Sequence, residues 1–289
     1  MLAARAPAKL NLTLRITGKR ADGYHLMESL VVFTEWHDNL LLSPADDLQC
    51  TVSGPFAEDA GSTDANLVLK AARLLQHDYA EAVAGRGAHF HLTKQVPVGA
   101  GLGGGSSDAA AALKLLNAAW DLRLEMDELH RLGLQLGADV PMFLRQVPMV
   151  ARGIGEILSP LGMALPAWHA VLVYPRQVLR TPDVYAAYTH APRQDAPTPN
   201  PEDSAALERL VRHGSNDLQR PAISLCPAVA EVLLALQAHP SMPLAARMSG
   251  SGACCFALHD TRAEAERMRD DLRARYPLWW VEYTAIRSA

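Results

Sequence analysis

The chain has no long hydrophobic run: none approaches the about 20 apolar residues that a membrane-spanning helix needs. Residues 1–7 contain no long apolar core, so we expect no signal peptide. Cysteine is scarce, and the four thiols show no C-x-x-C spacing, which favours reduced, buried side chains in a cytoplasmic protein over a disulfide framework. The net charge is −4 and the basic residues are dispersed, which argues against a nucleic-acid-binding surface.

Lysine is also rare. Only five lysines accompany 22 arginines, and none follows Lys114. This bias raises the expectation that a lysine which remains is required as lysine. The rest of the composition, with 49% hydrophobic and 20% charged residues over 289 positions, is that of a globular protein of one large or two medium domains.

Strand and helix patterns are mixed along the chain without a steady strand-helix-strand rhythm, which predicts an α+β fold. Apolar residues at positions 10, 12, 14 and 16 alternate with polar ones. This period predicts a strand with one buried face, and it places Lys9 and Asn11 together on the other face. Further strands are expected near residues 30–33, 39–42, 48–52, 90–96, 170–173 and 279–284, and helices over 66–75, 109–120, 127–136 and 263–276.

Polar and glycine residues predict the ends of several of these elements. Asp127 is the expected N-cap of the helix over 127–136, Gly137 its C-cap, and Pro141 the start of a short helix that follows. Residues 190–203, with four prolines, predict an exposed loop. A glycine-rich turn over 249–252 is expected to run into a buried strand, and we place a domain boundary near residue 155.

The most informative segment is the glycine-rich stretch over residues 97–108, P-V-G-A-G-L-G-G-G-S-S-D. Glycine lets several backbone N–H groups turn toward one point, and the helix that follows adds unpaired N–H groups and the positive end of its dipole. Together these features predict a site for phosphate. A Walker P-loop is excluded because Gly105 is followed by Ser106 and Ser107 rather than by lysine.

Two other interpretations of this loop remain weaker. A dinucleotide fingerprint matches at Gly99, Gly101 and Gly104, but the preceding segment alternates apolar with polar residues and ends at Pro97, unlike a buried parallel strand. A flexible linker is disfavoured because an amphipathic helix follows directly.

Four pieces of the sequence are candidates for chemistry: Lys9 on its strand, the Tyr24-His25 pair at a turn, the glycine loop, and Asp139 in a glycine-proline break. Each has an ordinary structural interpretation as well, as a solvated lysine, turn residues, a flexible linker or a capping acid. His89 and His91 share one strand face, but no third ligand at a suitable spacing suggests a metal site.

The order of these motifs resembles that of the GHMP kinases, which include galactokinase and the homoserine, mevalonate and phosphomevalonate kinases. The resemblance rests on residues 7–12, 22–25, 97–109 and 250–253, and it spans nearly the full length. Residues 21–25, 137–141 and 215–218 are most similar to those of the kinases that act on a cytidine diphosphate-linked methylerythritol. One departure is Ala100, where the family often has glycine, and alanine would strain the loop if that position needed a positive φ.

This resemblance implies the two-domain GHMP kinase fold. Residues 1–155 would form an ATP-binding, catalytic domain like domain 2 of ribosomal protein S5, and residues 156–289 a ferredoxin-like domain whose last strand may return to the first. The implied activity is ATP-dependent phosphorylation, with Mg²⁺, of the 2-hydroxyl of the cytidyl methylerythritol in the non-mevalonate route to isoprenoid precursors. The expected partner is this small molecule, with no nucleic acid or membrane, in a cytoplasmic monomer or weak homodimer.

Roles for individual residues are also implied by the resemblance. Asp139 would take the proton from the acceptor hydroxyl or orient it, and Lys9 would stabilise the developing negative charge. Asn11 would hold the polyol, whereas Tyr24, His25, Thr181 and Tyr185 would surround the cytidine. The ATP-binding residues would be Pro97, Val98, Gly99, Ala100, Gly101, Leu102, Gly103, Gly104, Gly105, Ser106 and Ser107, with Lys94 and Asn66 for adenine. Of these, the amides over residues 101–107 would hold the phosphates.

Three other functions remain open at this point. One is a GHMP kinase for another small alcohol of the homoserine or mevalonate type, which the Tyr24-His25 pair disfavours. Another is a nicotinamide-dependent dehydrogenase that uses the G-x-G-x-x-G match. The third is an inactive binding module on the kinase fold, against which the presence of both Lys9 and Asp139 argues.

Overall fold

The structure is a computed structural model of the chain, and it describes residues 1–60, 65–189 and 201–288. The chain packs as two compact units, each assembled from several stretches. The first unit comprises Met1–Ala8, Trp36–Val98 and Gly103–Gln146, and the second comprises Lys9–Glu35, Gly99–Leu102 and Val147–Ala289. The predicted boundary near residue 155 stays a prediction.

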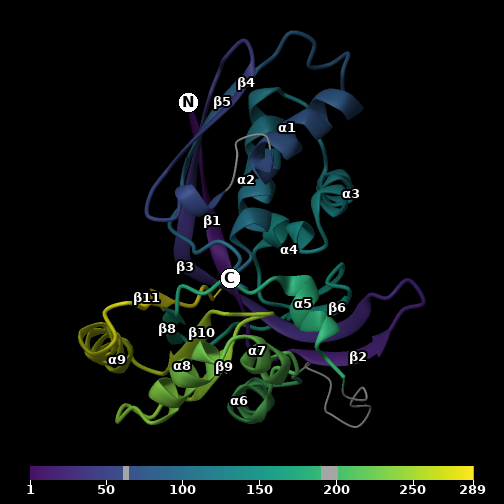
Figure 1. Cartoon of the computed structure of the whole chain (residues 1–289). Coiled ribbons are helices and arrows are strands. Elements are labelled where there is room, and N and C mark those ends of the chain that lie inside the picture. The colour runs from purple at the N-terminus through teal and green to yellow at the C-terminus, as the bar shows by residue number, and fades with distance from the viewer. Residues whose placement is uncertain (61–64, 190–200, 289) are drawn as a thin grey trace. The chain divides into compact units, whose positions relative to one another are not determined.

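In its described residues, the first unit combines strands with four α-helices. Its elements are the start of β1 (Leu2–Asn11), the end of β3 (His25–Ser43), β4 (Leu48–Ser53), the short 3₁₀ helix η1 (Glu58–Ala60), α1 (Leu67–Asp78), β5 (Ala88–Thr93), α2 (Gly104–Ala119), α3 (Met126–Leu136) and α4 (Val140–Arg145). Strand β5 pairs in parallel with β4 and antiparallel with the end of β3. The four α-helices lie together beside β4 and β5 (Figure 1).

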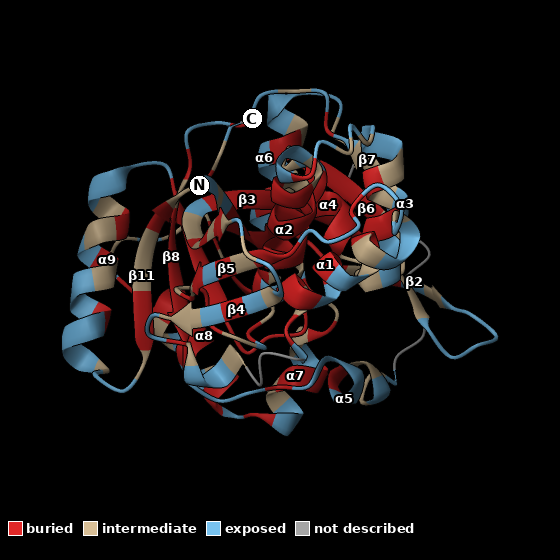
Figure 2. Ribbon diagram, turned by 90° about the horizontal axis from the view of Figure 1, so that it is seen from above, coloured by how far each residue is buried: buried red, intermediate tan, exposed pale blue. Residues whose placement is uncertain are grey.

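Helix α2 is the central element of this group. Ten of its residues are buried, including four consecutive alanines at positions 109–112. Side chains this small let α1 and α4 approach closely, and Figure 2 shows α2 buried along much of its length. This packing holds α2 in place, and with it the first turn of the helix at the glycine loop.

The second unit contains the remaining elements. They are the end of β1, β2 (Arg15–Lys19), the start of β3, β6 (Met149–Gly153), β7 (Ile157–Pro160), β8 (His169–Tyr174), α5 (Thr181–Ala186), α6 (Ser204–His213), α7 (Gln219–Leu225), α8 (Ala228–Gln237), β9 (Ala245–Met248), β10 (Cys255–His259), α9 (Arg262–Arg275) and β11 (Trp280–Ala285). The start of β3 pairs antiparallel with β2 and with β6, and β6 pairs with β7.

Four strands of the second unit form an antiparallel sheet in the order β11-β8-β10-β9. Helices separate β8 from β9 and β10 from β11, which is the β-α-β-β-α-β pattern of a ferredoxin-like domain. Helices α8 and α9 pack against this sheet, and α9 keeps an exposed outer face (Figure 2). The ferredoxin-like expectation is confirmed, and β11 pairs with β8 within this sheet.

Several predicted elements differ in their limits. The strand predicted around residues 10–16 is two strands, β1 and β2, and the ones predicted at 30–33 and 39–42 are a single strand, β3. The strand predicted over 90–96 ends at Thr93, and the helix predicted over 109–120 begins five residues earlier, at Gly104. Periodicity locates apolar faces better than it locates the residues where elements end.

The caps near Asp139 were predicted in part. Glu125, not Asp127, is the N-cap of α3, so that Asp127 lies in the first turn. Gly137 is the C-cap, as expected, and Pro141 lies in the first turn of α4, which begins one residue earlier. Most of the predicted loop over 190–203 lies outside the described residues, and Asp203 is the N-cap of α6.

Two absences in the described residues bear on the expectations from composition. No helix in residues 1–60, 65–189 or 201–288 is long and apolar enough to cross a membrane. The four cysteines are buried and free of disulfides.

Candidate functional site

The first part of the glycine loop, Gly99–Leu102, lies in the second unit. Gly99 and Gly101 have φ values of +64° and +79°, which favour glycine. Ala100 is not among the residues with positive φ, so alanine causes no strain there. A Cβ on Gly101 would overlap the carbonyl oxygen of Ser249 and lie 2.9 Å from the amide nitrogen of Gly252. The two glycine-rich segments therefore pack backbone against backbone.

The second part of the loop forms the start of α2 in the first unit. Gly103 is the N-cap, with a φ of +70°, and the amide of Ser107 donates to the Gly103 carbonyl at 2.9 Å. An α-helix leaves the amides before that position, here those of Gly104, Gly105 and Ser106, without an intrahelical acceptor. The helix therefore uses the amide of Ser107, so this amide is removed from those predicted to bind phosphate over residues 101–107.

Ser107 offers its side chain instead. Its hydroxyl oxygen is fully buried and has no hydrogen-bond partner within the described part of the chain. A buried polar atom normally finds a partner, so this oxygen is a candidate ligand for a group that the structure does not contain.

Lys9 is buried, with a relative exposure of 5%, which excludes the interpretation as a solvated strand lysine. Its ammonium group donates to Asn11 Oδ1, and Asn11 Nδ2 donates to Ser29 Oγ at 2.7 Å. A Cβ on Gly250 would lie 2.9 Å from Lys9 Nζ, so the second glycine turn passes directly over the ammonium group. The predicted half-exposed strand is wrong here, because both faces are buried at Lys9 and Asn11.

A hydrogen-bond network holds this second glycine turn in place. Asn216 Nδ2 donates to the carbonyl oxygens of Met248 and Gly250 at 2.8 and 2.7 Å. The Ser249 hydroxyl donates to the Gly101 carbonyl at 3.1 Å and accepts from the Asn11 amide at 3.3 Å. Sequence reasoning gave Asn216 and Ser249 no role, because their partners are more than 140 residues away or are backbone atoms.

Residues predicted to bind cytidine gather in the second unit. The His25 ring stacks on Tyr185, with ring centroids 5.6 Å apart, and meets the edge of Tyr188 at 5.8 Å. Burial, followed by the charge of Lys19, lowers the pKa of His25, which favours the neutral ring at pH 7. Tyr24 is 61% exposed, so its ring is accessible to a ligand.

Thr181 begins α5, and its hydroxyl lies 2.9 Å from the Ser251 hydroxyl of the glycine turn. Thr181, His25 and Tyr185 thus share the second unit with Lys9 and Asn11. Tyr188 was not predicted; it lies two residues after the end of α5 and three after Tyr185, and only this proximity in the sequence could have suggested it.

Asp139 lies in the first unit as the N-cap residue of α4, two residues after the Gly137 C-cap of α3. Its side chain is half-buried and caps no backbone amide. The carboxylate is therefore not used for helix capping. The predicted pairing of Asp139 with Lys9 stays a prediction, since the two residues belong to different units.

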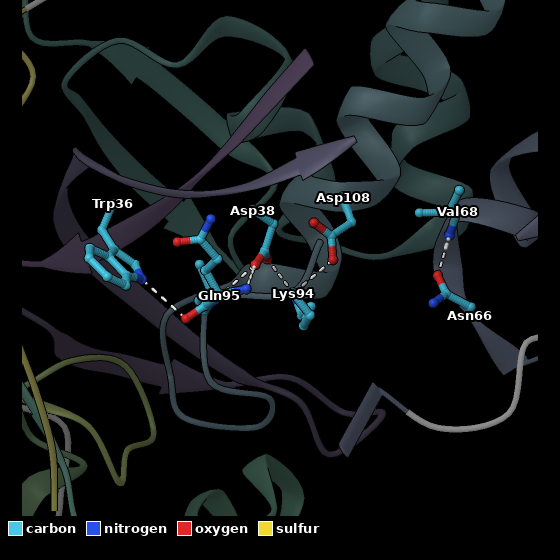
Figure 3. A network of polar contacts seen from close by, with 8 residues as sticks. Trp36, Asp38, Asn66, Val68, Lys94, Gln95 and Asp108 are labelled. Carbon is cyan, nitrogen blue, oxygen red and sulfur yellow. Dashed lines mark hydrogen bonds and ion pairs between the residues drawn. The ribbon is translucent and has the colours of Figure 1, made fainter. Parts of the chain in front are cut away.

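Lys94 and Asn66, predicted to bind adenine, have partners within the first unit. Figure 3 shows Lys94 between Asp38 and Asp108; its ammonium donates to both carboxylates. Asn66 Oδ1 accepts from the amide of Val68 at 2.9 Å, as the N-cap of α1. Sequence reasoning missed Asp38 and Asp108, although a charged residue inside an apolar strand or helix is a signal for such a buried pair.

No group of three or more His, Cys, Asp and Glu side chains within residues 1–60, 65–189 and 201–288 is arranged to hold a metal ion. The His91 ring instead contacts the hydroxyls of Thr51 and Ser53, at 2.8 and 3.3 Å, on an exposed strand face.

Comparisons with known proteins identify the family. Residues 66–146 match the N-terminal domain of GHMP kinases, and residues 200–278 match the GHMP kinase C-terminal domain. The chain is 47% identical to a 4-diphosphocytidyl-2-C-methyl-D-erythritol kinase of Paramagnetospirillum magneticum, covering 96% of this chain and 95% of that protein. It is 43% identical to the kinase of that name from Paracoccus denitrificans, covering 98% and 96%.

Solved structures give the same result. A crystal structure of 4-(cytidine 5'-diphospho)-2C-methyl-D-erythritol kinase superposes with a TM-score of 0.79, at 34% identity and 100% coverage of both chains. A homoserine kinase from Cytophaga hutchinsonii shares the fold alone, with a TM-score of 0.72 at 17% identity over 99% of this chain and 95% of that one. The chain therefore belongs to the GHMP kinases, within the family of the 4-diphosphocytidyl-2-C-methyl-D-erythritol kinases, and is an ATP-dependent phosphotransferase.

Proposed function

We propose that the chain transfers the γ-phosphoryl group of ATP to the 2-hydroxyl of 4-diphosphocytidyl-2-C-methyl-D-erythritol, in the non-mevalonate route to isoprenoid precursors. The relatives that bear this substrate's name support the choice of acceptor. The observation in the structure that carries the proposal is the buried ammonium group of Lys9, which is hydrogen-bonded to Asn11 and covered by Gly250. A cation held in this way is suited to stabilise charge on a transferring phosphoryl group.

The proposed reaction needs a proton acceptor and a charge stabiliser. As the substrate oxygen forms its bond to the γ-phosphorus, the bond from that phosphorus to ADP breaks, and Asp139 accepts the hydroxyl proton. A carboxylate is a weak base for an alcohol, so the positive charge of Lys9 is proposed to favour the alkoxide character of the acceptor. Phosphoryl transfer otherwise depends mainly on positioning, which we assign to the amides at the start of α2.

The unpaired Ser107 hydroxyl fits the expectation of a Mg²⁺ ion. Mg²⁺ prefers oxygen ligands and is held in such enzymes by few protein groups together with substrate phosphates. We propose Ser107 as its protein ligand. When bound, the ion would neutralise negative charge on the phosphates.

The aromatic group in the second unit is proposed to bind the cytidine. Tyr24 and Tyr185 offer ring faces for stacking on the base, and a neutral His25 can donate or accept a hydrogen bond at the base edge. Asn11 is proposed to hold the polyol, and Thr181 to contact the nucleotide. The buried free cysteines suit the reducing cytoplasm, where we propose that the enzyme acts as a monomer or weak homodimer.

A coupled assay of ADP release tests the proposed function. The wild type is expected to consume ATP only with the cytidyl acceptor, and Asp139→Ala is expected to lower kcat about 10²–10⁴-fold while ATP still binds. Asp127→Ala, in the exposed first turn of α3, is the matched control and should retain wild-type turnover. Equal turnover with homoserine or mevalonate would contradict the acceptor, and full activity of Asp139→Ala would contradict the base.

Lys9→Met separates charge stabilisation from binding. Loss of the ammonium should lower kcat by orders of magnitude, with a smaller change in the KM for either substrate. A defect confined to KM would contradict the proposed role of Lys9.

A further inference from the structure

Three charged side chains are buried together in the first unit: Asp38, Lys94 and Asp108, each with a relative exposure of 2% or less. Lys94 Nζ donates to Asp38 Oδ2 and, at 2.8 Å, to Asp108 Oδ2. Burial alone would lower the pKa of Lys94, but the two carboxylates raise it overall, so the ammonium stays charged. Burying charges costs free energy even when they are paired, which suggests that this cluster has a role beyond stability.

Asp38 fixes the segment that enters the glycine loop. Its Oδ1 accepts from the amides of Gln95 and Val96 at 2.5 and 2.8 Å, in addition to the contact of Oδ2 with Lys94. Trp36, two residues before Asp38, donates from Nε1 to the Gln95 carbonyl at 3.1 Å. Three consecutive residues just before Pro97 are therefore tied to β3. Figure 3 shows two of them, Lys94 and Gln95, beside Asp38.

Asp108 and Lys94 fix the segment that leaves the loop. Asp108 lies in α2, one turn after Gly104. A Cβ on Gly104 would lie 2.8 Å from Lys94 Nζ and 3.1 Å from Val96 Cγ1, so the first turn of α2 rests directly on the ammonium. The cluster thus joins the backbone before the glycine loop to the backbone after it.

We propose that Asp38 and Asp108 are positioning residues for the nucleotide: by holding Lys94 between them, they fix the first turn of α2, whose amides bind the phosphates of ATP. The inference rests on the proposed phosphate site at the start of α2. Donors that are fixed in advance lose little entropy on binding and need no reorganisation during the reaction. A displacement of about 1 Å in such a site can cost about 10²-fold in rate.

Steady-state kinetics of Asp38→Asn and Asp108→Asn test this role, measured above the pKa of about 7 that burial gives Asp108, so that Asp108 of the wild type is ionised. Each variant is expected to raise the KM for Mg²⁺-ATP about tenfold and to leave the KM for the cytidyl acceptor unchanged. The double variant should raise the KM for ATP by less than the product of the two single effects, because both carboxylates act through one ammonium group. Asp121→Asn, an exposed residue just after the other end of α2, is the control and should behave as wild type.

The melting temperature of each variant shows whether it is folded at the assay temperature. If an asparagine variant does not fold, Gly104→Ala replaces it, because its methyl group would displace the Lys94 ammonium while both carboxylates remain. This variant should also raise the KM for ATP selectively. An unchanged KM for ATP in folded variants, or equal rises for both substrates, would overturn the inference alone, whereas a wild type that does not turn over ATP would overturn the proposed function.

Discussion

The two halves of the glycine-rich loop use glycine for different reasons. In the first half, Gly101 is required by packing, because a side chain would overlap the backbone of the second glycine turn. In the second half, Gly104 and Gly105 start a helix, and their φ values are not positive. At Gly104 an added Cβ would meet a side-chain ammonium, and at Gly105 it would meet Leu67 Cδ1 at an ordinary 3.5 Å.

This difference separates glycine needed for the fold from glycine needed for a ligand. The first half is closed to side chains by the protein itself, so substitution there should reduce stability. The exposed Gly105 is open to side chains in the protein alone, so substitution there should matter only when phosphate approaches the backbone. Stability and nucleotide affinity measured on the same variants distinguish the two.

The largest effect is expected for Gly101→Ala. Both the positive φ and the overlap with Ser249 oppose an alanine, and we expect the free energy of unfolding to fall by about 3 kcal/mol or more. Urea denaturation measures this change. Gly18→Ala is the matched control in the same unit, since its Cβ would lie 3.5 Å from Leu26 Cδ1, and a loss as large there would contradict the packing argument.

A smaller loss of stability, about 1–2 kcal/mol, is expected for Gly104→Ala. The contact at 2.8 Å is with the end of a lysine side chain, which can shift only by lengthening its bonds to two buried carboxylates. Thermal unfolding measures the loss. A destabilisation equal to that of Gly101→Ala would mean that the two halves do not differ as described.

The second half is also expected to respond to pH through Asp108. Burial raises the pKa of Asp108 to about 7; Lys94 opposes this shift and Asp38 adds to it. An aspartate in the unfolded chain has a pKa of about 3.9, so between about pH 4 and 7 the folded protein holds a proton that the unfolded chain has lost. The free energy of unfolding should therefore fall as pH rises through this window, by at most about 1.4 kcal/mol per pH unit, and level off above it.

Melting temperatures of the wild type and Asp108→Asn across this window measure that contribution. Other titrating groups are common to both proteins, so the difference isolates Asp108. The curve of Asp108→Asn should be flatter, and parallel curves would contradict the assignment.

The smallest effect on stability, with the opposite sign, is expected for Gly105→Ala. Alanine is the better helix former, and the added Cβ meets no close contact, so we expect a gain of about 0.5–1 kcal/mol. Binding of Mg²⁺-ATP, measured by calorimetry, should nevertheless weaken, because the methyl group would occupy space that the phosphates need. Unchanged affinity would show that the phosphates do not approach Gly105.

Much of the fold could be predicted from local patterns. Apolar periodicity located α1, α3, α9, β4, β8 and β11 to within a few residues, since it reports which face of an element is buried. It failed at the start of α2, because the glycines and serines there show no apolar period although their backbone is helical. It also failed within β3, where a single strand of 19 residues was predicted as two.

The candidate site was predicted less completely. Lys9, His25 and the loop glycines stood out because their residue types and spacing matched known chemistry. Asp38 did not, and Asn216 and Ser249 lay within noted segments without being given a role, because each acts on partners that are distant in the sequence or belong to the backbone. Such partners leave no periodic signal.

The sequence by itself determined the family, the α+β class and the presence of a phosphate-binding glycine loop, because ordered motifs and apolar periods are local properties of the chain. Only the tertiary structure decided that Lys9 is buried under Gly250, that His25 stacks on Tyr185, and that Lys94 is held between two carboxylates. The physical reason is that the surroundings of a charge, and the room beside a glycine, are set by residues that folding brings from elsewhere in the chain.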